Sequence, residues 1–298
     1  MAGQWGEQPE KLLRHYDRTA QSAAHQVIKR YSSSFFLASG LLRGHVRTDI
    51  RSLYAVVRIA DEIVDGAGHA AGLSTDECRV LLNDYEHQVL QASHRRINSD
   101  LILHAYGISA RRCGFKDAHI RAFFNSMRRD LDNHEQLSQQ ELNSYIYGSA
   151  EVIGLLCLQS FLVNFPVTEQ QREKMEAGAR RLGAAFQKIN FLRDLASDME
   201  FLGRQYFPEL ESNELNDGIK AELVADIRQD LDFARDSVAL LPADARLGVA
   251  AALELFSELT TEIDRISATD LLRRRVSLSP AHKALVMTRV PRTWLKKK

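Results

Sequence analysis

The chain is poor in residues that interrupt helices or build covalent frameworks. It has six prolines and three cysteines among 298 residues. Cys78, Cys113 and Cys157 are widely separated, so they fit neither a zinc site nor a disulfide framework and indicate a reducing compartment. Lys plus Arg and Asp plus Glu balance at 39 each, and no glycine-rich dinucleotide fingerprint occurs. These features argue against a disulfide-stabilised secreted domain, a zinc module, a nucleic-acid binder and a Rossmann-type enzyme.

Long apolar segments are also missing. The first ten residues are polar and contain Pro9, without the apolar core of a signal peptide. The most apolar run, residues 152–163, has about 12 residues, which is too few to span a bilayer. We therefore expect a cytoplasmic protein.

Helical periodicity is the main pattern in the sequence. Strict alternation of apolar and polar residues, the pattern of half-buried strands, is almost absent. The sequence therefore predicts an all-α protein, and capping boxes are expected at Ser138–Glu141 and Thr168–Gln171. Helices are expected at residues 16–30, 46–65, 75–92, 98–112, 117–135, 139–165, 169–200, 217–240, 243–267 and 280–289.

No linker or repeat divides the chain. We expect a loose N-terminal tail at residues 1–15, one helical domain at residues 16–290, and a basic C-terminal tail at residues 291–298.

Two acidic pairs stand out, because each is embedded in an otherwise apolar helix. Residues four apart project from nearly the same helix face, so Asp61 and Asp65 form one acidic stripe, and Asp194 and Asp198 form another. Helices that are apolar on most sides are largely buried, and buried carboxylates are costly unless paired or bound to a metal. If the stripes face each other across a cavity, divalent cations with oxygen ligands would relieve the repulsion, and Mg²⁺ shares itself between carboxylates and phosphates.

The residues around the two stripes resemble the two signatures of the squalene/phytoene synthase family. The first runs from Ser32-Ser33-Ser34-Phe35 through Leu53-Tyr54-Ala55 to Arg58-Ile-Ala-Asp61-Glu-Ile-Val-Asp65-Gly66. The second runs from Leu182-Gly183-Ala-Ala-Phe-Gln187 through Asn190-Phe-Leu-Arg193-Asp194 to Asp198, followed by Gly203-Arg204-Gln-Tyr206-Phe-Pro208. Tyr145-Ile-Tyr-Gly148 resembles the central helix, and Arg275-Val276-Ser277 with Lys283 resembles the C-terminal basic stretch.

The resemblance covers about residues 25–290 and is strongest to bacterial phytoene synthases. Two positions depart from the pattern: Glu62 stands where many relatives have Asp, and Arg43 where many have Pro.

The resemblance implies an all-α, single-domain helical bundle of the isoprenoid (terpenoid) synthase type with a central active-site cavity. It also implies Mg²⁺-dependent head-to-head joining of two geranylgeranyl diphosphates, through a cyclopropylcarbinyl diphosphate, to phytoene. Mg²⁺, with Mn²⁺ as an alternative, is the expected cofactor, and no NADPH is expected.

Residue roles follow from the matched motifs. The expected metal ligands are Asp61, Asp65, Asn190, Asp194 and Asp198, and the expected catalytic residues are these aspartates together with Tyr54 and Tyr145. The expected substrate-binding residues are Ser34, Phe35, Arg58, Gln187, Asn190, Arg193, Arg204, Tyr206, Arg275 and Lys283.

Three alternatives stay open at this point. The same residues would serve a squalene, dehydrosqualene or presqualene diphosphate synthase that uses farnesyl diphosphate. A family member without catalysis would act as an assembly factor, although it has no need of four intact aspartates. A third alternative is an ordinary helical adaptor, for which the acidic stripes have no explanation.

The C-terminal segment suggests a membrane partner. Five cationic side chains lie within the last ten residues, next to Trp294 and Leu295. Trp favours the membrane interface, and cations favour an anionic surface. The alternative is a frayed, solvated terminus without a membrane role. The hypothesis is reversible peripheral binding to the inner face of the cell membrane.

Overall fold

The structure is a computed structural model that describes residues 8–132, 137–197, 207 and 215–294. The described residues contain helices and no strand, so the all-α prediction is confirmed. The helices are α1 (Gln8–Tyr31), α2 (Ser33–Gly40), α3 (Gly44–Asp65), α4 (Ala67–Ala70), α5 (Thr75–Ala92), α6 (Leu101–Cys113), α7 (Asp117–Asp132), α8 (Gln139–Ile146), the π-helical segment η1 (Tyr147–Glu151), α9 (Val152–Leu162), α10 (Glu169–Ser197), α11 (Asp217–Val238), α12 (Ala243–Arg265), α13 (Ala268–Leu271) and α14 (Pro280–Trp294).

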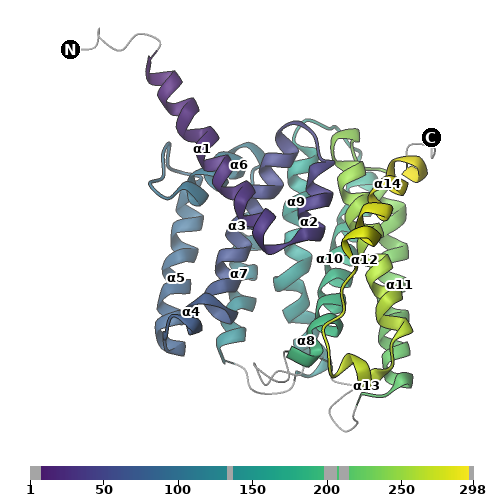
Figure 1. Ribbon diagram of the computed structural model, residues 1–298. Helices are drawn as coiled ribbons and strands as arrows, with labels where there is room; N and C mark the ends of the chain where they lie inside the picture. Colours follow the sequence, from purple (N-terminus) through teal and green to yellow (C-terminus); the bar gives the residue numbers. More distant parts are fainter. Residues whose placement is uncertain (1–7, 133–136, 198–206, 208–214, 295–298) are drawn as a thin grey trace.

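The long helices form an antiparallel bundle with two distinct ends (Figure 1). Helices α3, α7, α10 and α12 begin at the upper end and finish at the lower end, while α5, α9 and α11 run in the opposite direction. A backbone hydrogen bond of 2.9 Å from the Arg43 amide to the Asp244 carbonyl ties the start of α3 to the start of α12. The two acidic motifs finish α3 and α10, so they come to the same lower end.

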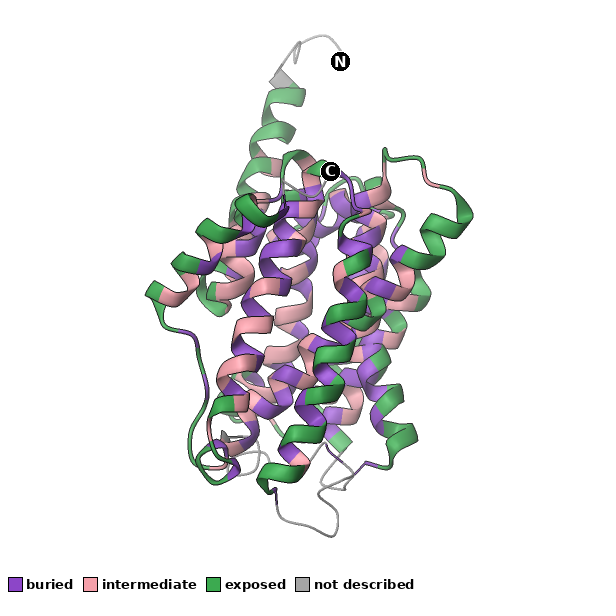
Figure 2. Cartoon of the chain, turned by 90° about the vertical axis from the view of Figure 1, so that its right-hand side faces the viewer, coloured by how far each residue is buried: buried purple, intermediate pink, exposed green. Residues whose placement is uncertain are grey.

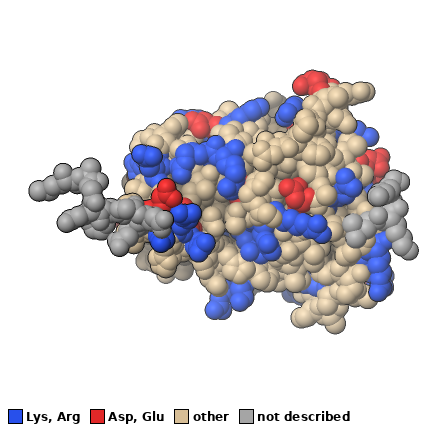
Figure 3. Space-filling view, turned by 90° about the horizontal axis from the view of Figure 1, so that it is seen from above, with Lys and Arg blue, Asp and Glu red and all other residues tan. Residues whose placement is uncertain are grey.

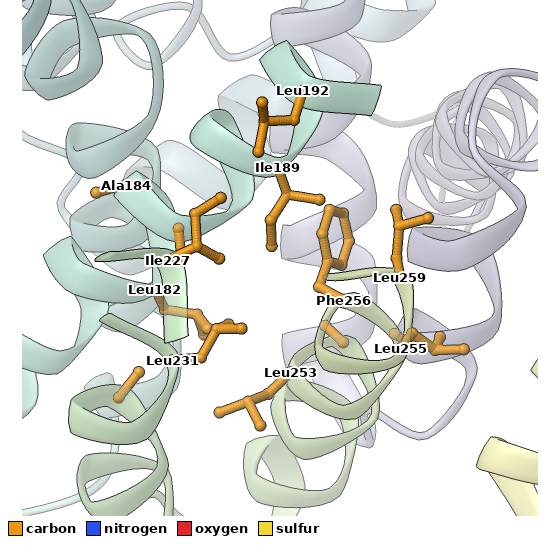
Figure 4. Close-up of a cluster of buried hydrophobic side chains, with 14 of the residues drawn as sticks. Leu182, Ala184, Ile189, Leu192, Ile227, Leu231, Leu253, Leu255, Phe256 and Leu259 are labelled. Atoms are coloured by element: carbon orange, nitrogen blue, oxygen red, sulfur yellow. The ribbon is translucent and has the colours of Figure 1, made fainter. Parts of the chain in front are cut away.

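The bundle has two hydrophobic cores. One is built mainly from α1, α3, α5, α6 and α7, with Val152 and Leu156 of α9, and the other mainly from α2 and α8 to α14. Figure 2 shows buried positions running along the inner faces of the helices, with exposed positions outside. In Figure 4, side chains of α10, α11 and α12 from the second core point toward one another, among them Ile189, Ile227 and Leu253. Cys157 on α9 packs against both cores and joins them.

Local signals predicted the helix starts well. Ser138 and Glu141 form the expected capping box, with reciprocal hydrogen bonds of 2.9 and 3.3 Å. Thr168 and Gln171 form the same arrangement at the start of α10. The segment Ser33–Gly40 was absent from the predicted helices, although Ser32 caps it by accepting a hydrogen bond from the Phe35 amide.

Both chain termini differ from expectation. Helix α1 begins at Gln8, inside the predicted loose tail, and α14 continues to Trp294 although Pro291 lies within it. Trp294 is 3% exposed, and its indole Nε1 donates a 3.0 Å hydrogen bond to Glu254. The prediction that Trp294 sits at a membrane interface is therefore wrong, because tertiary packing against α12 buries it. Residues 295–298 lie outside the described part.

The centre of the bundle is one continuous helical run, Gln139–Leu162, formed by α8, η1 and α9. It is long and apolar enough to cross a membrane by length and composition, unlike the shorter apolar run expected from the sequence. Its position between the two cores gives a different reason for its composition. Glycines allow close packing here: a Cβ at Gly154 would overlap the Ala179 carbonyl oxygen, and one at Gly183 would lie 2.6 Å from the Ala150 oxygen.

We predict that Gly154→Ala lowers the stability of the protein. The added methyl group meets backbone of α10 rather than a movable side chain, and overpacking of this kind costs about 1–3 kcal/mol. Urea unfolding followed by circular dichroism measures the change in the free energy of unfolding. Gly40→Ala is the matched control, since nothing lies within 4 Å of a Cβ there. Equal stability of the two variants would contradict the close-packing argument.

Candidate active site

A cavity of about 1050 Å³ lies between the two cores. That volume is at the upper end of the range for small-molecule sites. Its lining comes from both cores, for example Leu53 and Met127 from one and Leu42 and Leu182 from the other. The expected central cavity is therefore present.

The two ends of the cavity have different chemistry. At the lower end it is lined by the final turns of α3 and α10, the start of α2, residues 275–278 and Lys283. Toward the upper end its lining is apolar and comes from the end of α2, the first turns of α12 and the last turns of α9 and α11. A ligand with a charged head and a long apolar tail matches this division.

Two acidic residues at the lower end, Asp61 and Asp194, are paired with arginines. Asp61, Asp65 and Asp194 all line the cavity and are half-buried rather than fully buried. Arg58 donates to Asp61 at 2.7 Å and also forms an ion pair with Glu62. Arg58 thus spans two carboxylates on its own helix, and its guanidinium also stacks 4.5 Å from the centre of the Tyr31 ring.

Asp194 is held by two arginines from different parts of the chain. Arg193 forms a two-pronged ion pair with its neighbour, with Nε 2.9 Å from Asp194 Oδ1. The Nε of Arg275 donates to the same Oδ1 at 2.6 Å. The C-terminal basic stretch therefore reaches the second acidic motif.

Lys283 completes a cationic group at this end. Its Nζ donates a 2.6 Å hydrogen bond to the Ser33 hydroxyl at the start of α2. Burial lowers the pKa of Lys283, and the nearby charges of Arg193 and Arg275 lower it further. Three cations that repel one another beside a cavity form a site suited to an anion.

Asn190 and Gln187 line the cavity one and two turns before Asp194. The Oδ1 atom of Asn190 is buried and has no hydrogen-bond partner among the described residues. Buried polar atoms normally have a partner, so this oxygen is suited to a ligand atom. The Ser149 hydroxyl on η1 is a second cavity-lining polar group without a partner in the described ranges, and sequence reasoning missed it.

The oxygen donors fit a hard divalent cation in type. Asp61, Asp65, Asn190 and Asp194 supply carboxylate and amide oxygens, which Mg²⁺ and Mn²⁺ accept. However, no three or more His, Cys, Asp and Glu side chains gather closely enough to hold a metal ion within the described ranges. The predicted convergence of four carboxylates is not seen there, since arginines occupy the space beside Asp61 and Asp194 and Asp198 is not among the described residues.

Aromatic rings line the cavity above the charged end. Phe35 contacts Tyr54, Phe186 and Phe256, with ring centres 5.3 to 6.1 Å apart. Phe186 and Phe256 stack at 4.0 Å. Phe35 therefore belongs to the apolar wall, whereas Ser34 lines the cavity near Lys283. Burial raises the pKa of Tyr54 to about 12, so its phenol stays protonated at neutral pH.

Tyr145 lines the cavity but directs its hydroxyl to a neighbouring helix. The phenol donates a 3.1 Å hydrogen bond to Asp130 on α7, and both residues are buried. Sequence reasoning missed Asp130. The apolar positions Ile120, Phe123 and Met127 define the buried face of α7, and Asp130 continues that face three residues later. The signal available in the sequence was an acidic residue, Asp130, on the otherwise apolar face of this helix.

The structure explains one departure from the family pattern. Glu62 pairs with Arg58 and accepts a 3.1 Å hydrogen bond from the Ala67 amide, and it is not part of the cavity lining. Its role is therefore to fix Arg58 and the end of α3. Arg43 is exposed at the upper end. Arg204 and Tyr206, like Asp198, lie outside the described residues.

A family model named squalene/phytoene synthase matches residues 28–282 of this chain. The chain belongs to the squalene/phytoene synthase family. The matched region contains all the described residues that were predicted to form the site except Lys283, which follows it directly.

Known proteins agree with this assignment. The chain is 26% identical over 263 residues to a bifunctional lycopene cyclase/phytoene synthase of Leptosphaeria maculans, covering 78% of this chain and 44% of that protein. It is 29% identical over 208 residues to 4,4'-diapophytoene synthase of Staphylococcus haemolyticus, covering 69% and 68%. A crystal structure of a dehydrosqualene synthase superposes with a TM-score of 0.77 at 21% identity, covering 96% of this chain and 99% of that one. The isoprenoid synthase-type fold predicted from the sequence is thereby confirmed.

The raised pKa of Tyr54 predicts a pH dependence of stability. Burial is the main cause, and the charge of Asp61 adds to it while Arg58 opposes it. The folded protein keeps this proton between pH 10 and about 12, whereas the unfolded chain loses it, so the stability falls as pH rises through this range. Tyr54→Phe removes this contribution, which amounts to about 1 kcal/mol at pH 11 relative to pH 8.

Urea unfolding at pH 8, 10 and 11 measures this difference between the wild type and Tyr54→Phe. Tyr147→Phe serves as the control, because Tyr147 is 37% exposed on the surface. The same pH dependence in the wild type and in Tyr54→Phe would show that the Tyr54 phenol is not desolvated.

Proposed function

We propose that the protein is a prenyltransferase that joins two geranylgeranyl diphosphates head to head and releases phytoene and two diphosphates. One observation carries the proposal: a single cavity has carboxylates, an unpartnered amide oxygen and three cations at one end, and an apolar lining toward the other. Family membership supports the reaction class. The relatives named for phytoene and diapophytoene synthesis support a carotenoid-type product.

The cationic residues bind the diphosphate head. Arg193 and Arg275 lie close enough to lower the pKa of Lys283, and an anion among the three cations would relieve their repulsion. Arg58 stands beside Asp61 and supplies a fourth cation at the cavity edge. Asp61, Asp65, Asn190 and Asp194, with Asp198, would hold Mg²⁺, which when bound neutralises charge on the departing diphosphate.

The reaction then follows from breaking the bond between the first carbon of the prenyl chain and its diphosphate oxygen. The electron pair leaves with the diphosphate, and an allylic cation remains. The double bond of the second substrate attacks this cation, and loss of a proton closes a cyclopropylcarbinyl diphosphate. A second departure of diphosphate, rearrangement and loss of another proton give the C40 hydrocarbon.

The apolar wall protects the carbocation intermediates from water and holds them in position. The rings of Phe35, Phe186 and Phe256 exclude water and present π faces that stabilise positive charge. Tyr54 contributes a neutral phenol, because its raised pKa keeps it protonated. Tyr145 is held in place by Asp130, so we assign Asp130 the role of positioning residue for that ring.

We further propose that the protein works in the cytoplasm without a nicotinamide cofactor. Joining two C20 chains to phytoene transfers no hydride, whereas the farnesyl-based route to squalene needs one.

Carboxylate variants test the site. We predict that Asp61→Ala, Asp65→Ala and Asp194→Ala each reduce kcat about 100-fold or more, because charge stabilisation by a bound metal supplies several kcal/mol. The same loss is expected for Asp198→Ala. The Asp61→Ala, Asp65→Ala and Asp194→Ala variants should remain folded, because these side chains line the cavity and belong to neither hydrophobic core.

The matched control is Asp132→Ala, which removes an exposed carboxylate that is paired with Arg79 and is not part of the cavity lining. It keeps wild-type turnover. Near wild-type turnover by an Asp61→Ala/Asp65→Ala double variant would refute the carboxylate site.

Product analysis tests the reaction. Purified protein with Mg²⁺ and geranylgeranyl diphosphate is expected to form a C40 hydrocarbon, identified by mass spectrometry, without any nicotinamide. Omission of divalent metal with a chelator present stops the reaction. Turnover of farnesyl diphosphate but not of geranylgeranyl diphosphate would overturn the substrate assignment. A requirement for NADPH would overturn the proposed reaction. A folded protein that turns over neither substrate would favour an assembly factor.

A further inference from the structure

The apolar end of the cavity lies beneath a cation-rich face. Leu42, which follows α2, and Gly248 and Val249 in α12 line the cavity at the upper end of the bundle. Arg43 follows Leu42 directly, is exposed, and precedes the first residue of α3. Hydrocarbon held in the cavity is therefore close to this outer face.

Cations on this face exceed the available acids. Figure 3 shows the upper end with Lys and Arg side chains spread across it and few Asp or Glu between them. Arg43 and Arg47 are exposed, and neither forms an ion pair with another residue of the described ranges. Burial lowers the pKa of His25, and Arg51, Lys29 and Arg47 lower it further; burial and Arg47 also lower the pKa of Arg51. The whole chain has a formal net charge of zero, so this excess is local.

Exposed apolar side chains lie at the same end. Phe165, in the connection between α9 and α10, is 40% exposed. Ile97, in the connection between α5 and α6, is 58% exposed and follows Arg95 and Arg96. Apolar and aromatic tips among cations are the combination that favours the interface of an anionic bilayer.

We propose that this upper face, defined by Arg43, Arg47, Arg95, Arg96, Ile97 and Phe165, docks the protein on an anionic lipid bilayer. Its charge complements anionic headgroups, and its apolar tips reach below them. Docking in this orientation places the apolar end of the cavity next to lipid and leaves the charged mouth toward water. The benefit of that orientation rests on the proposed function, because prenyl chains and a C40 hydrocarbon dissolve in lipid.

The binding is peripheral. The described part of the chain holds one helix long and apolar enough to span a bilayer, Gln139–Leu162, and that helix lies between the two cores. Helix α14 also runs toward the upper end and exposes Arg289 and Arg292.

Vesicle co-sedimentation of the full chain tests the proposal. Sucrose-loaded vesicles of phosphatidylcholine, with and without phosphatidylglycerol as the anionic lipid, are compared at low and high salt. We expect binding to anionic vesicles at low salt, and its loss at high salt and with neutral vesicles. Arg43→Gln/Arg47→Gln should lower the binding constant about 30-fold, because each cation near the surface changes it roughly fivefold.

Matched control variants distinguish docking through the upper face from a general effect of the protein's positive charges. Arg228→Gln/Arg265→Gln removes two exposed charges at the lower end and should change binding less than about twofold. Phe165→Ala should weaken binding, whereas Val80→Ala, which trims a 69% exposed side chain on α5, should not. Unchanged thermal transitions show that the variants are folded. The proposal is overturned if the two double variants bind anionic vesicles equally well. It is also overturned if the wild type binds an acidic polymer but not anionic vesicles.

Activity assays keep this proposal separate from the proposed function. With substrate in detergent micelles, Arg43→Gln/Arg47→Gln should turn over like the wild type, and with substrate in anionic vesicles it should be slower. Absence of wild-type turnover in micelles would refute the proposed function while the binding result still decides the docking. Equal rates of the two double variants on vesicles would overturn the link between docking and substrate access.

Discussion

The lower end of the cavity must hold opposite charges at the edge of an apolar interior. A half-buried carboxylate is costly without a partner, and the same holds for a cation. Arg58 meets this requirement for Asp61, while Arg193 and Arg275 meet it for Asp194. Because Arg275 comes from the segment before α14, the balance of charge joins parts of the chain that are far apart in sequence. Under the proposed function, the same groups would exchange these partners for a diphosphate and its metal ions.

The apolar part of the cavity depends on how closely the central helical run can approach its neighbours. Glycines at positions 154 and 183 let α9, η1 and α10 pack backbone to backbone on one side. The aromatic rings of α2, α10 and α12 then close another part of the wall. The cavity therefore sits between two cores, each of which is well packed by itself. Binding of a long apolar chain would complete their contact.

Particular residues show how far sequence reasoning reached. The helix periodicity, both capping boxes and the acidic stripes were readable, and the structure brings Asp61, Asp65, Asn190 and Asp194 to one cavity as expected. Trp294 was misread as a membrane anchor, because its burial depends on Glu254 and Arg235 of other helices. Asp130 was missed for the same reason: its partner Tyr145 belongs to a different helix.

The sequence by itself determined the fold class through helical periodicity, the family through its motifs, and the polar residues of the two acidic helices that face the cavity through their spacing within single helices. The tertiary structure decided which carboxylate meets which arginine, that Glu62 serves Arg58 rather than the cavity, and that the cations of several elements share the face above its apolar end. Such features depend on distances between elements. Local periodicity leaves those distances open, and packing of the two cores fixes them.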